Sequence, residues 1–151
     1  VKNALINTQG GNTSAVEDFN ELNPYVEVAS TVFDGIPLAF WSDWVHNTSA
    51  PSQANGYQVG VKLGKPTVPW SVKHGWGIGY FYERHEADSA FDGFVDSDFG
   101  GGGTNHQGHV LWLSLATLTN STATAKYASG EEVTGAKDHE DRLQLDWVTK
   151  F

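Results

Sequence analysis

The chain has 151 residues, a formal net charge of -9, 17 glycines, and no cysteine or methionine. Its length suits one domain, and the lack of cysteine excludes disulfides and thiolate metal sites. The nine Lys and Arg residues are widely scattered. Nucleic acid is therefore excluded as a partner, because phosphate binding needs clustered cations.

Apolar and polar residues alternate in many segments, which is the period of a half-buried strand. In chain order, we expect about eight strands, at residues 3–9, 24–33, 38–47, 57–64, 75–82, 109–119, 122–129 and 142–151. In the fifth segment, bulky residues alternate with glycine at Gly75, Gly77 and Gly79. In the last segment, Leu143 and Leu145 share one face. These patterns predict an all-β protein.

The connections between the expected strands alternate in length. Short turns are expected at residues 34–36, 65–69 and 120–121. Long polar loops are expected at residues 10–23, 48–55, 86–107 and 130–141, and they hold 13 of the 18 acidic residues. Short turns at one end and long loops at the other are typical of outer-membrane barrels. The sequence therefore predicts an antiparallel transmembrane β-barrel, with residues 1–151 forming one barrel domain or part of one.

A glycine-rich segment at residues 96–109, DSDFGGGGTNHQGH, resembles a motif of the putative porin family of Gram-negative outer membranes. Residues 76–82 are similar to the strand before that motif, and residues 55–65 to a neighbouring hairpin. The amphipathic last strand ends at Phe151, which resembles the signal read by the outer-membrane assembly machinery. The resemblance covers residues 22–151 and implies a bacterial outer-membrane location.

Members of this family are longer, and this chain resembles their C-terminal part. The presumed inner face carries Gly60, Gly64, Gly75, Gly77 and Gly79. Such a face would leave an eight-stranded barrel underfilled, whereas 16 to 18 strands enclose a water channel. We therefore expect the chain to form about half the wall of a barrel of about 16 strands. Its expected partners are the remaining N-terminal strands, membrane lipid, lipopolysaccharide and other copies of itself.

The expected function is passive diffusion of small hydrophilic solutes or ions through a water-filled pore. Ionisable residues on the polar strand faces cost little in a wet lumen but much in lipid. Candidate lining residues are Glu27, Asp43, Lys62, Glu83, Lys126, Arg142, Gln144 and Asp146. No nucleophile elbow or Ser-His-Asp grouping is present. We therefore expect no enzyme activity and no cofactor.

Weak Ca²⁺ or Mg²⁺ binding in the acidic outer loops is a further hypothesis. Its ligands would be Asp92, Asp96, Asp98 and Asn105, since such ions prefer carboxylate and amide oxygens. A solvated acidic loop without an ion remains the simpler interpretation.

The histidines give no indication of a transition-metal site. His106 and His109 are three residues apart, which points them to opposite faces of a strand. His46, His74 and His85 appear isolated in the sequence.

Two alternatives to an open pore remain. The chain is compatible with a closed eight-stranded outer-membrane barrel that serves as an anchor, an adhesion surface or a sheath around a partner protein. It is also compatible with a soluble β-sandwich that binds a ligand through a Ca²⁺-binding acidic loop.

Overall fold

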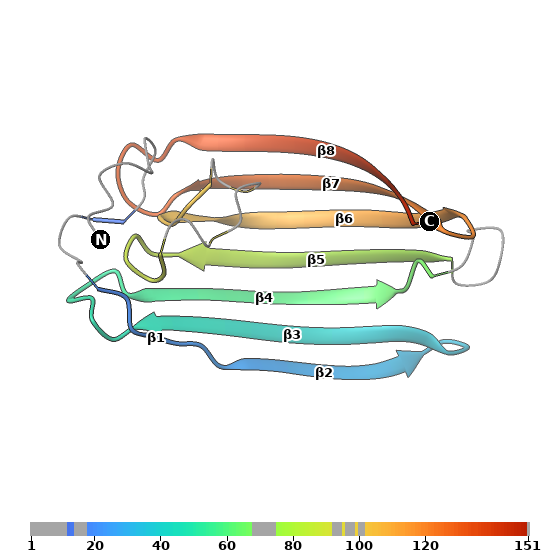
Figure 1. Cartoon of the computed structure of the whole chain (residues 1–151), viewed down its shortest axis with the longest axis horizontal. Coiled ribbons are helices and arrows are strands. Elements are labelled where there is room, and N and C mark those ends of the chain that lie inside the picture. The colour runs from blue at the N-terminus through green and yellow to red at the C-terminus, as the bar shows by residue number, and fades with distance from the viewer. Residues whose placement is uncertain are drawn as a thin grey trace.

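The computed structural model describes residues 12–13, 18–67, 75–91, 95, 99 and 102–150. Their regular elements form one antiparallel sheet of eight strands, which Figure 1 shows face on. The strands are β1 (Glu21–Leu22), β2 (Tyr25–Val32), β3 (Ile36–Asn47), β4 (Asn55–Gly64), β5 (Trp76–His85), β6 (His106–Leu118), β7 (Ser121–Glu132) and β8 (His139–Thr149). The expected all-β antiparallel class is confirmed.

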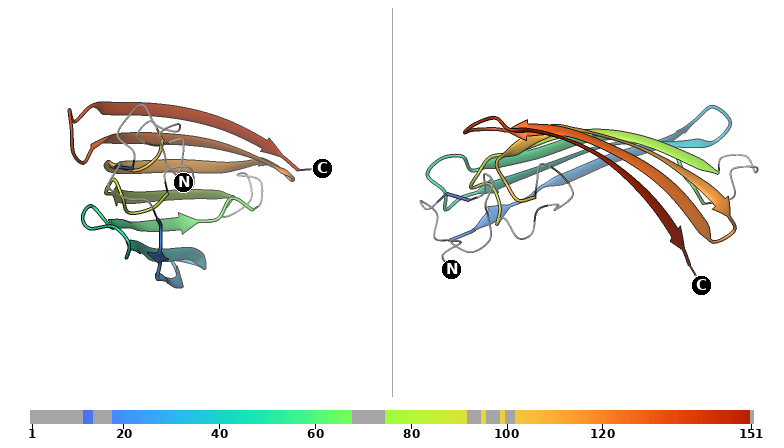
Figure 2. Two further views of the ribbon diagram at one scale, coloured as in Figure 1. Left: turned by 60° about the vertical axis from the view of Figure 1, so that its left-hand side comes forward. Right: turned by 90° about the horizontal axis from the view of Figure 1, so that it is seen from above.

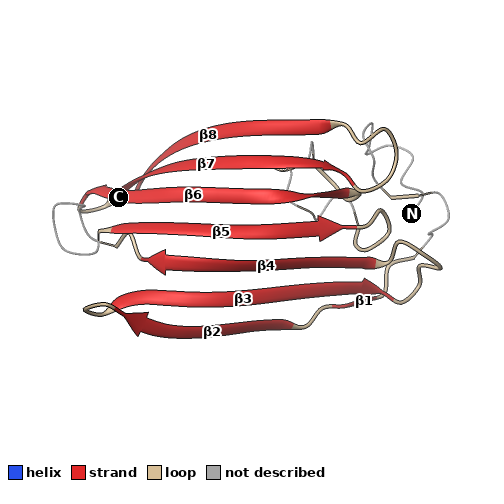
Figure 3. Ribbon diagram, turned by 180° about the vertical axis from the view of Figure 1, so that it is seen from behind, coloured by secondary structure: helices blue, strands red, loops and turns tan. Residues whose placement is uncertain are grey.

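The strands follow one another as a meander. β1 and β2 both pair with β3, and each later strand pairs with the next one in sequence. The sheet is open, and Figures 1 and 3 show β2 and β8 at its opposite edges. Within the described ranges, no helix is long and apolar enough to cross a membrane.

Most of the strands are longer than their hydrophobic pattern predicts. β4 begins at Asn55, β6 begins at His106, and β7 and β8 extend to Glu132 and from His139. The expected loops at 48–55, 86–107 and 130–141 are shorter for this reason, and β1 falls in the expected loop 10–23. Backbone pairing continues where both faces become polar, so hydrophobic alternation alone ends the strands too early. The expected strand at 3–9 lies outside the described residues.

One face of the sheet carries a broad apolar band. Its central row crosses seven strands through Val28, Phe40, Val61, Tyr80, Leu111, Tyr127 and Leu143. Most of these side chains are exposed. From Trp44 to Ile36 the apolar band runs about 27 Å along β3, at ~3.4 Å per residue. We call this the convex face, because it is the outer side of the arch that the sheet forms (Figure 2).

The opposite, concave face carries the buried core. Phe99, Val110 and Ala128 form a buried cluster, against which Phe81 and Trp112 pack. Phe99 comes from the segment between β5 and β6, whose described residues lie on the hollow side of the arch in Figure 2. The concave face is therefore partly covered at the end where the longer loops lie.

Candidate functional site: the polar concave face

All eight candidate lining residues lie on the concave face. Strand alternation places every second side chain there, and the register aligns them across the sheet. Asp43, Gln58 and Glu83 form one row across β3, β4 and β5. Lys62 on β4 is in the row that Gly79, Trp112, Lys126 and Gln144 continue across β5 to β8. The sequence pattern thus predicted which residues share a face.

An ion pair marks the β2 side of this face. Lys62 Nζ lies 2.9 Å from Glu27 Oε2, and the Tyr25 hydroxyl donates to the same oxygen at 2.7 Å. The Lys62 ammonium also lies 5.8 Å from the centre of the Trp41 ring. Both charged side chains are partly exposed. Charges of both signs are therefore partly exposed on this face.

A hydrogen-bonded chain connects the middle of the face with its loop end. Trp41 Nε1 donates to Gln58 Oε1 at 3.1 Å, and Gln58 Nε2 donates to Glu83 Oε2 at 2.9 Å. On β8, Arg142 lies 3.0 Å from Glu140, and Gln144 donates to Asp146 at 3.0 Å. These partners fix the orientation of polar groups that would otherwise sample many rotamers.

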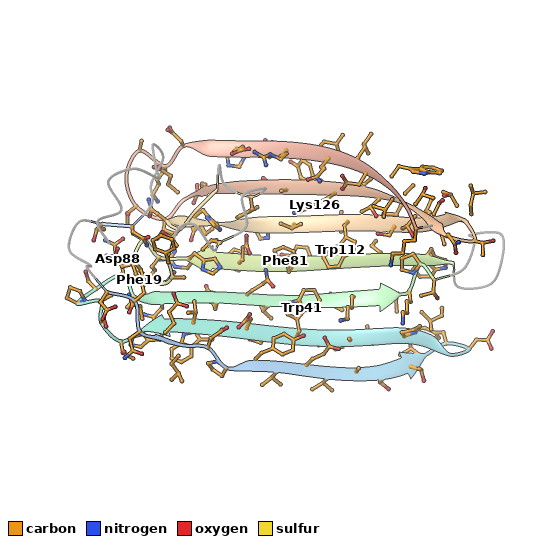
Figure 4. The ribbon with its side chains drawn as sticks, viewed as in Figure 1. Phe19, Trp41, Phe81, Asp88, Trp112 and Lys126 are labelled. Atoms are coloured by element: carbon orange, nitrogen blue, oxygen red, sulfur yellow. The ribbon has the colours of Figure 1, made fainter. Side chains whose placement is uncertain are left out.

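Three aromatic side chains form a floor on the concave face. Trp41, Phe81 and Trp112 have ring centres 6.0–6.3 Å apart, and Figure 4 shows them together across β3, β5 and β6. The Trp41 ring lies over Gly60 and the Trp112 ring over Gly79, so close that a Cβ atom at either glycine would overlap the indole.

Gly60 and Gly79 are therefore covered and not bare. The rings of neighbouring strands fill the space. The sequence carried a signal of this arrangement, because bulky residues occur at positions whose parity places them among glycines and polar residues.

A loop residue, Phe99, covers the loop end of the concave face. Phe99 is 1% exposed and packs edge-on against His106, with ring centres 4.8 Å apart. It lies on Gly108 and Gly130, which are register partners on β6 and β7. A Cβ atom at either glycine would come within 3 Å of the Phe99 ring. The two glycines thus leave the space that the Phe99 ring occupies.

Polar contacts fix the same loop region to the rest of the chain. Asp88 is 1% exposed and accepts hydrogen bonds from the backbone N–H and the hydroxyl of Thr13. The Asn47 side-chain amide donates to the Asp88 carbonyl at 3.0 Å, and the Thr104 hydroxyl donates to the Ala87 carbonyl at 2.6 Å. At these positions the acidic loop is packed rather than solvated.

Replacing Phe99 by Ala should release this loop. Loss of a buried Phe costs about 3–5 kcal/mol in protein cores. We expect the loop between β5 and β6 to be cleaved much faster in limited proteolysis of the full-length protein in detergent, while the sheet stays folded. Phe33→Ala, at a turn residue that is 84% exposed, is the control. Equal cleavage of both variants would show that Phe99 does not hold the loop.

The expected Ca²⁺ or Mg²⁺ ligands are only partly within the described ranges. Asp92, Asp96 and Asp98 lie outside them, as does Phe151. Asn105 is 6% exposed, and its side-chain oxygen accepts hydrogen bonds from the backbone N–H and the hydroxyl of Thr134. This amide is thus used in joining β6 to the loop before β8.

The interpretation of His85 as isolated is wrong. His85 and His106 are register partners on β5 and β6, and both lie close to Glu83. The comparison of His106 with His109 on the same strand was correct, because His109 lies on the convex face next to Tyr80. The partner of His106 is on the neighbouring strand, 21 residues earlier, which only the strand register reveals.

The structure is thus an arched antiparallel sheet with a largely apolar face on one side and ordered ionisable groups on the other. The chain belongs to the family described as "Putative porin", whose model matches residues 13–151. This membership confirms the resemblance seen in the sequence and indicates a porin-like role. No curated protein and no solved structure matches the chain.

Proposed function

We propose that this chain forms part of the wall of a bacterial outer-membrane pore that allows passive diffusion of small hydrophilic solutes or ions. The observation that carries the proposal is the division of the sheet into two faces that continue across seven strands. The convex face presents apolar side chains such as Phe40, Leu111 and Leu143, and the concave face presents Glu27, Lys62 and Gln144. Lipid suits the first face and a water-filled lumen suits the second.

Aromatic side chains near both ends of the apolar band also support the assignment of the convex face to lipid. Trp44 and Tyr57 are register partners at its loop end, and Trp147 lies near its opposite end on β8. Aromatic side chains are typical at the two interfaces of a bilayer. The row of Trp44 and Tyr57 continues across β5 to β7 with polar residues, where Arg84 donates a hydrogen bond to Gln107 and Gln107 donates one to Glu131.

The open edges favour a barrel with more strands. The described β2 and β8 lie at opposite sides of an arched sheet and are not paired with each other. Unpaired strand edges cannot face lipid, because their N–H and C=O groups would have no partner there. We propose that further strands, from a preceding part of the protein or a second copy of the chain, complete a barrel of about 16 strands. Lipid and lipopolysaccharide would surround it.

A soluble β-sandwich fits the observations less well. It would need a second sheet over the apolar convex face, and the described residues provide none. Large apolar surfaces that face water are rare in soluble monomers. A closed anchor barrel would need β8 to pair with the β2 side of the same sheet.

The pore should conduct ions with a preference for cations. On the described concave face, acidic side chains outnumber basic ones. The acids are Glu27, Asp43, Glu83, Glu132, Glu140 and Asp146, and the bases are Lys62, Lys126 and Arg142. Rings of carboxylates attract cations and repel anions. Reversal potentials of the full-length protein in planar bilayers under a salt gradient measure this preference.

Lys126→Glu should increase the cation preference, because it reverses a charge in the middle of the lining. Lys65→Glu, in the exposed turn after β4, is a control of equal charge change away from that position. A protein that inserts without conductance would contradict the pore, and an anion preference would contradict the role of the carboxylates.

A further inference from the structure

A cluster of three potential metal ligands lies at the loop end of the concave face. His85 and His106 face each other across the β5–β6 pair, and Glu83 precedes His85 by two residues on the same face. One ligand atom from each of the three side chains lies within 4.8 Å of the other two. His106 Nε2 lies 3.4 Å from Glu83 Oε1, and the two imidazole ring centres are 5.4 Å apart.

Several polar atoms of this cluster are buried without a hydrogen-bond partner. They are Glu83 Oε1, His85 Nδ1, and both ring nitrogens of His106. Glu83 is 4% exposed and His106 is 2% exposed. The 3.4 Å contact between Glu83 and His106 is within ion-pair range but does not have hydrogen-bond geometry. Buried polar atoms without partners are costly, so three neighbouring side chains that all carry such atoms are a candidate site for a bound ion.

The surroundings leave room for the cluster and limit its access to water. Gly56 on β4 is the register partner of His85, and a Cβ atom there would lie 2.5 Å from His85 Nδ1. Phe99 covers His106 from the loop side. A cavity of about 280 Å³, lined in part by Glu83, His85 and Asp43, lies beside the cluster.

We propose that Glu83, His85 and His106 bind a divalent transition-metal ion of the Zn²⁺ class at the loop end of the concave face. Imidazole nitrogen suits zinc, copper and nickel, whereas Ca²⁺ and Mg²⁺ require mainly oxygen ligands. Two histidines and one carboxylate are a known ligand set for zinc, with a fourth position left for water.

The observed spacing is close to what such an ion needs. Ligand atoms ~2.0–2.2 Å from a tetrahedral ion are about 3.3–3.6 Å apart. The Glu83–His106 distance is already within this range, and the remaining contacts need only small side-chain rotations. The hydrogen bond from Gln58 to the other oxygen of Glu83 would hold this carboxylate in place as a ligand.

The position of the site gives it a role distinct from conduction. A bound ion would join β5 and β6 directly beneath Phe99, in the region where the loop covers the concave face. The proposed site depends only on the pairing of these two strands and not on whether the barrel conducts. Failure of the pore proposal would therefore not affect the proposed metal site, and failure of the metal proposal would not affect the proposed pore.

Metal titration of the full-length protein, folded in detergent and treated with chelator beforehand, tests the proposal. We expect one Zn²⁺ per chain by calorimetry, and visible absorption bands of low-symmetry Co²⁺ when Co²⁺ is used as the probe. An excess of Ca²⁺ or Mg²⁺ should not displace either ion. Zn²⁺ should also raise the unfolding temperature, because an ion that binds only the folded state stabilises it.

Three single variants, His85→Gln, His106→Gln and Glu83→Gln, should each weaken Zn²⁺ binding by at least about tenfold. His109→Gln is the matched control, since His109 is on the same strand as His106 but on the convex face. Heat-modifiable migration in gels checks that each variant folds. His85, which is more accessible than the other two, provides the readout if the fully buried positions do not tolerate change.

Unchanged Zn²⁺ affinity in the folded His85→Gln variant would overturn the proposal. So would a folded parent protein that binds no Zn²⁺, which would leave Glu83 and His106 as a metal-free ion pair. Loss of binding in His109→Gln alone would place the metal on the wrong face and would overturn it equally.

Discussion

Leu143→Arg should lower the free energy of unfolding in a bilayer by about 2–4 kcal/mol, the typical cost of an arginine facing lipid near the midplane. Leu143 lies in the central row of the convex apolar band and is 69% exposed. Its exposure indicates that nothing within the described sheet would shield the guanidinium. Reversible urea unfolding of the full-length protein in lipid vesicles measures the difference.

Gln144→Arg is the matched control for this experiment. This variant introduces arginine at the next position of β8. The side chain there is on the concave face, and Lys126 is its register partner. We expect a change of less than about 1 kcal/mol there, as for substitutions that face a wet lumen. Equal destabilisation by both variants would show that β8 has no lipid-facing side.

The second large effect is expected at Gly79. Gly79→Val should destabilise the sheet by about 1–3 kcal/mol, as overpacking does in cores, because its Cβ atom would overlap the Trp112 ring. Valine otherwise favours strands, so a loss of stability would have to come from this contact.

A double-mutant cycle isolates the contact. In a Trp112→Ala background, Gly79→Val should cost much less, giving a coupling energy of at least about 1 kcal/mol. The same urea unfolding experiment supplies all four stabilities. Additive effects would mean that Trp112 does not lie on Gly79 in the folded protein, and the described packing of the three aromatic side chains would be wrong.

The division into faces could be predicted from the sequence because strand geometry is local. Side chains alternate with a period of two whatever the strand pairs with, so Lys62, Glu83 and Gln144 were placed on one face by parity alone. The glycines on that face were also recognised in the sequence. The aromatic rings that cover them were not predicted, because a glycine in a strand shows only that a side chain is missing and not what fills the space.

The strand ends were less predictable. Arg84 and His85 continue β5 beyond the apolar band, where neither face is hydrophobic. Hydrogen bonds of the backbone ladder maintain the pairing there, and these leave no trace in side-chain polarity. Because the expected strand ended at Tyr82 and the next began at His109, the sequence pattern did not indicate that His85 and His106 are register partners.

The sequence by itself determined the class of the protein, since alternation, glycine content and the spacing of turns are properties of single segments. It also placed the eight candidate lining residues on one face. The tertiary structure alone decided which residues are neighbours. Strand register brings His85 opposite His106, indole rings from β3 and β6 cover glycines of β4 and β5, and Phe99 seats on Gly108 and Gly130. These contacts join residues distant in sequence, and they depend on how packing and loop length align whole strands.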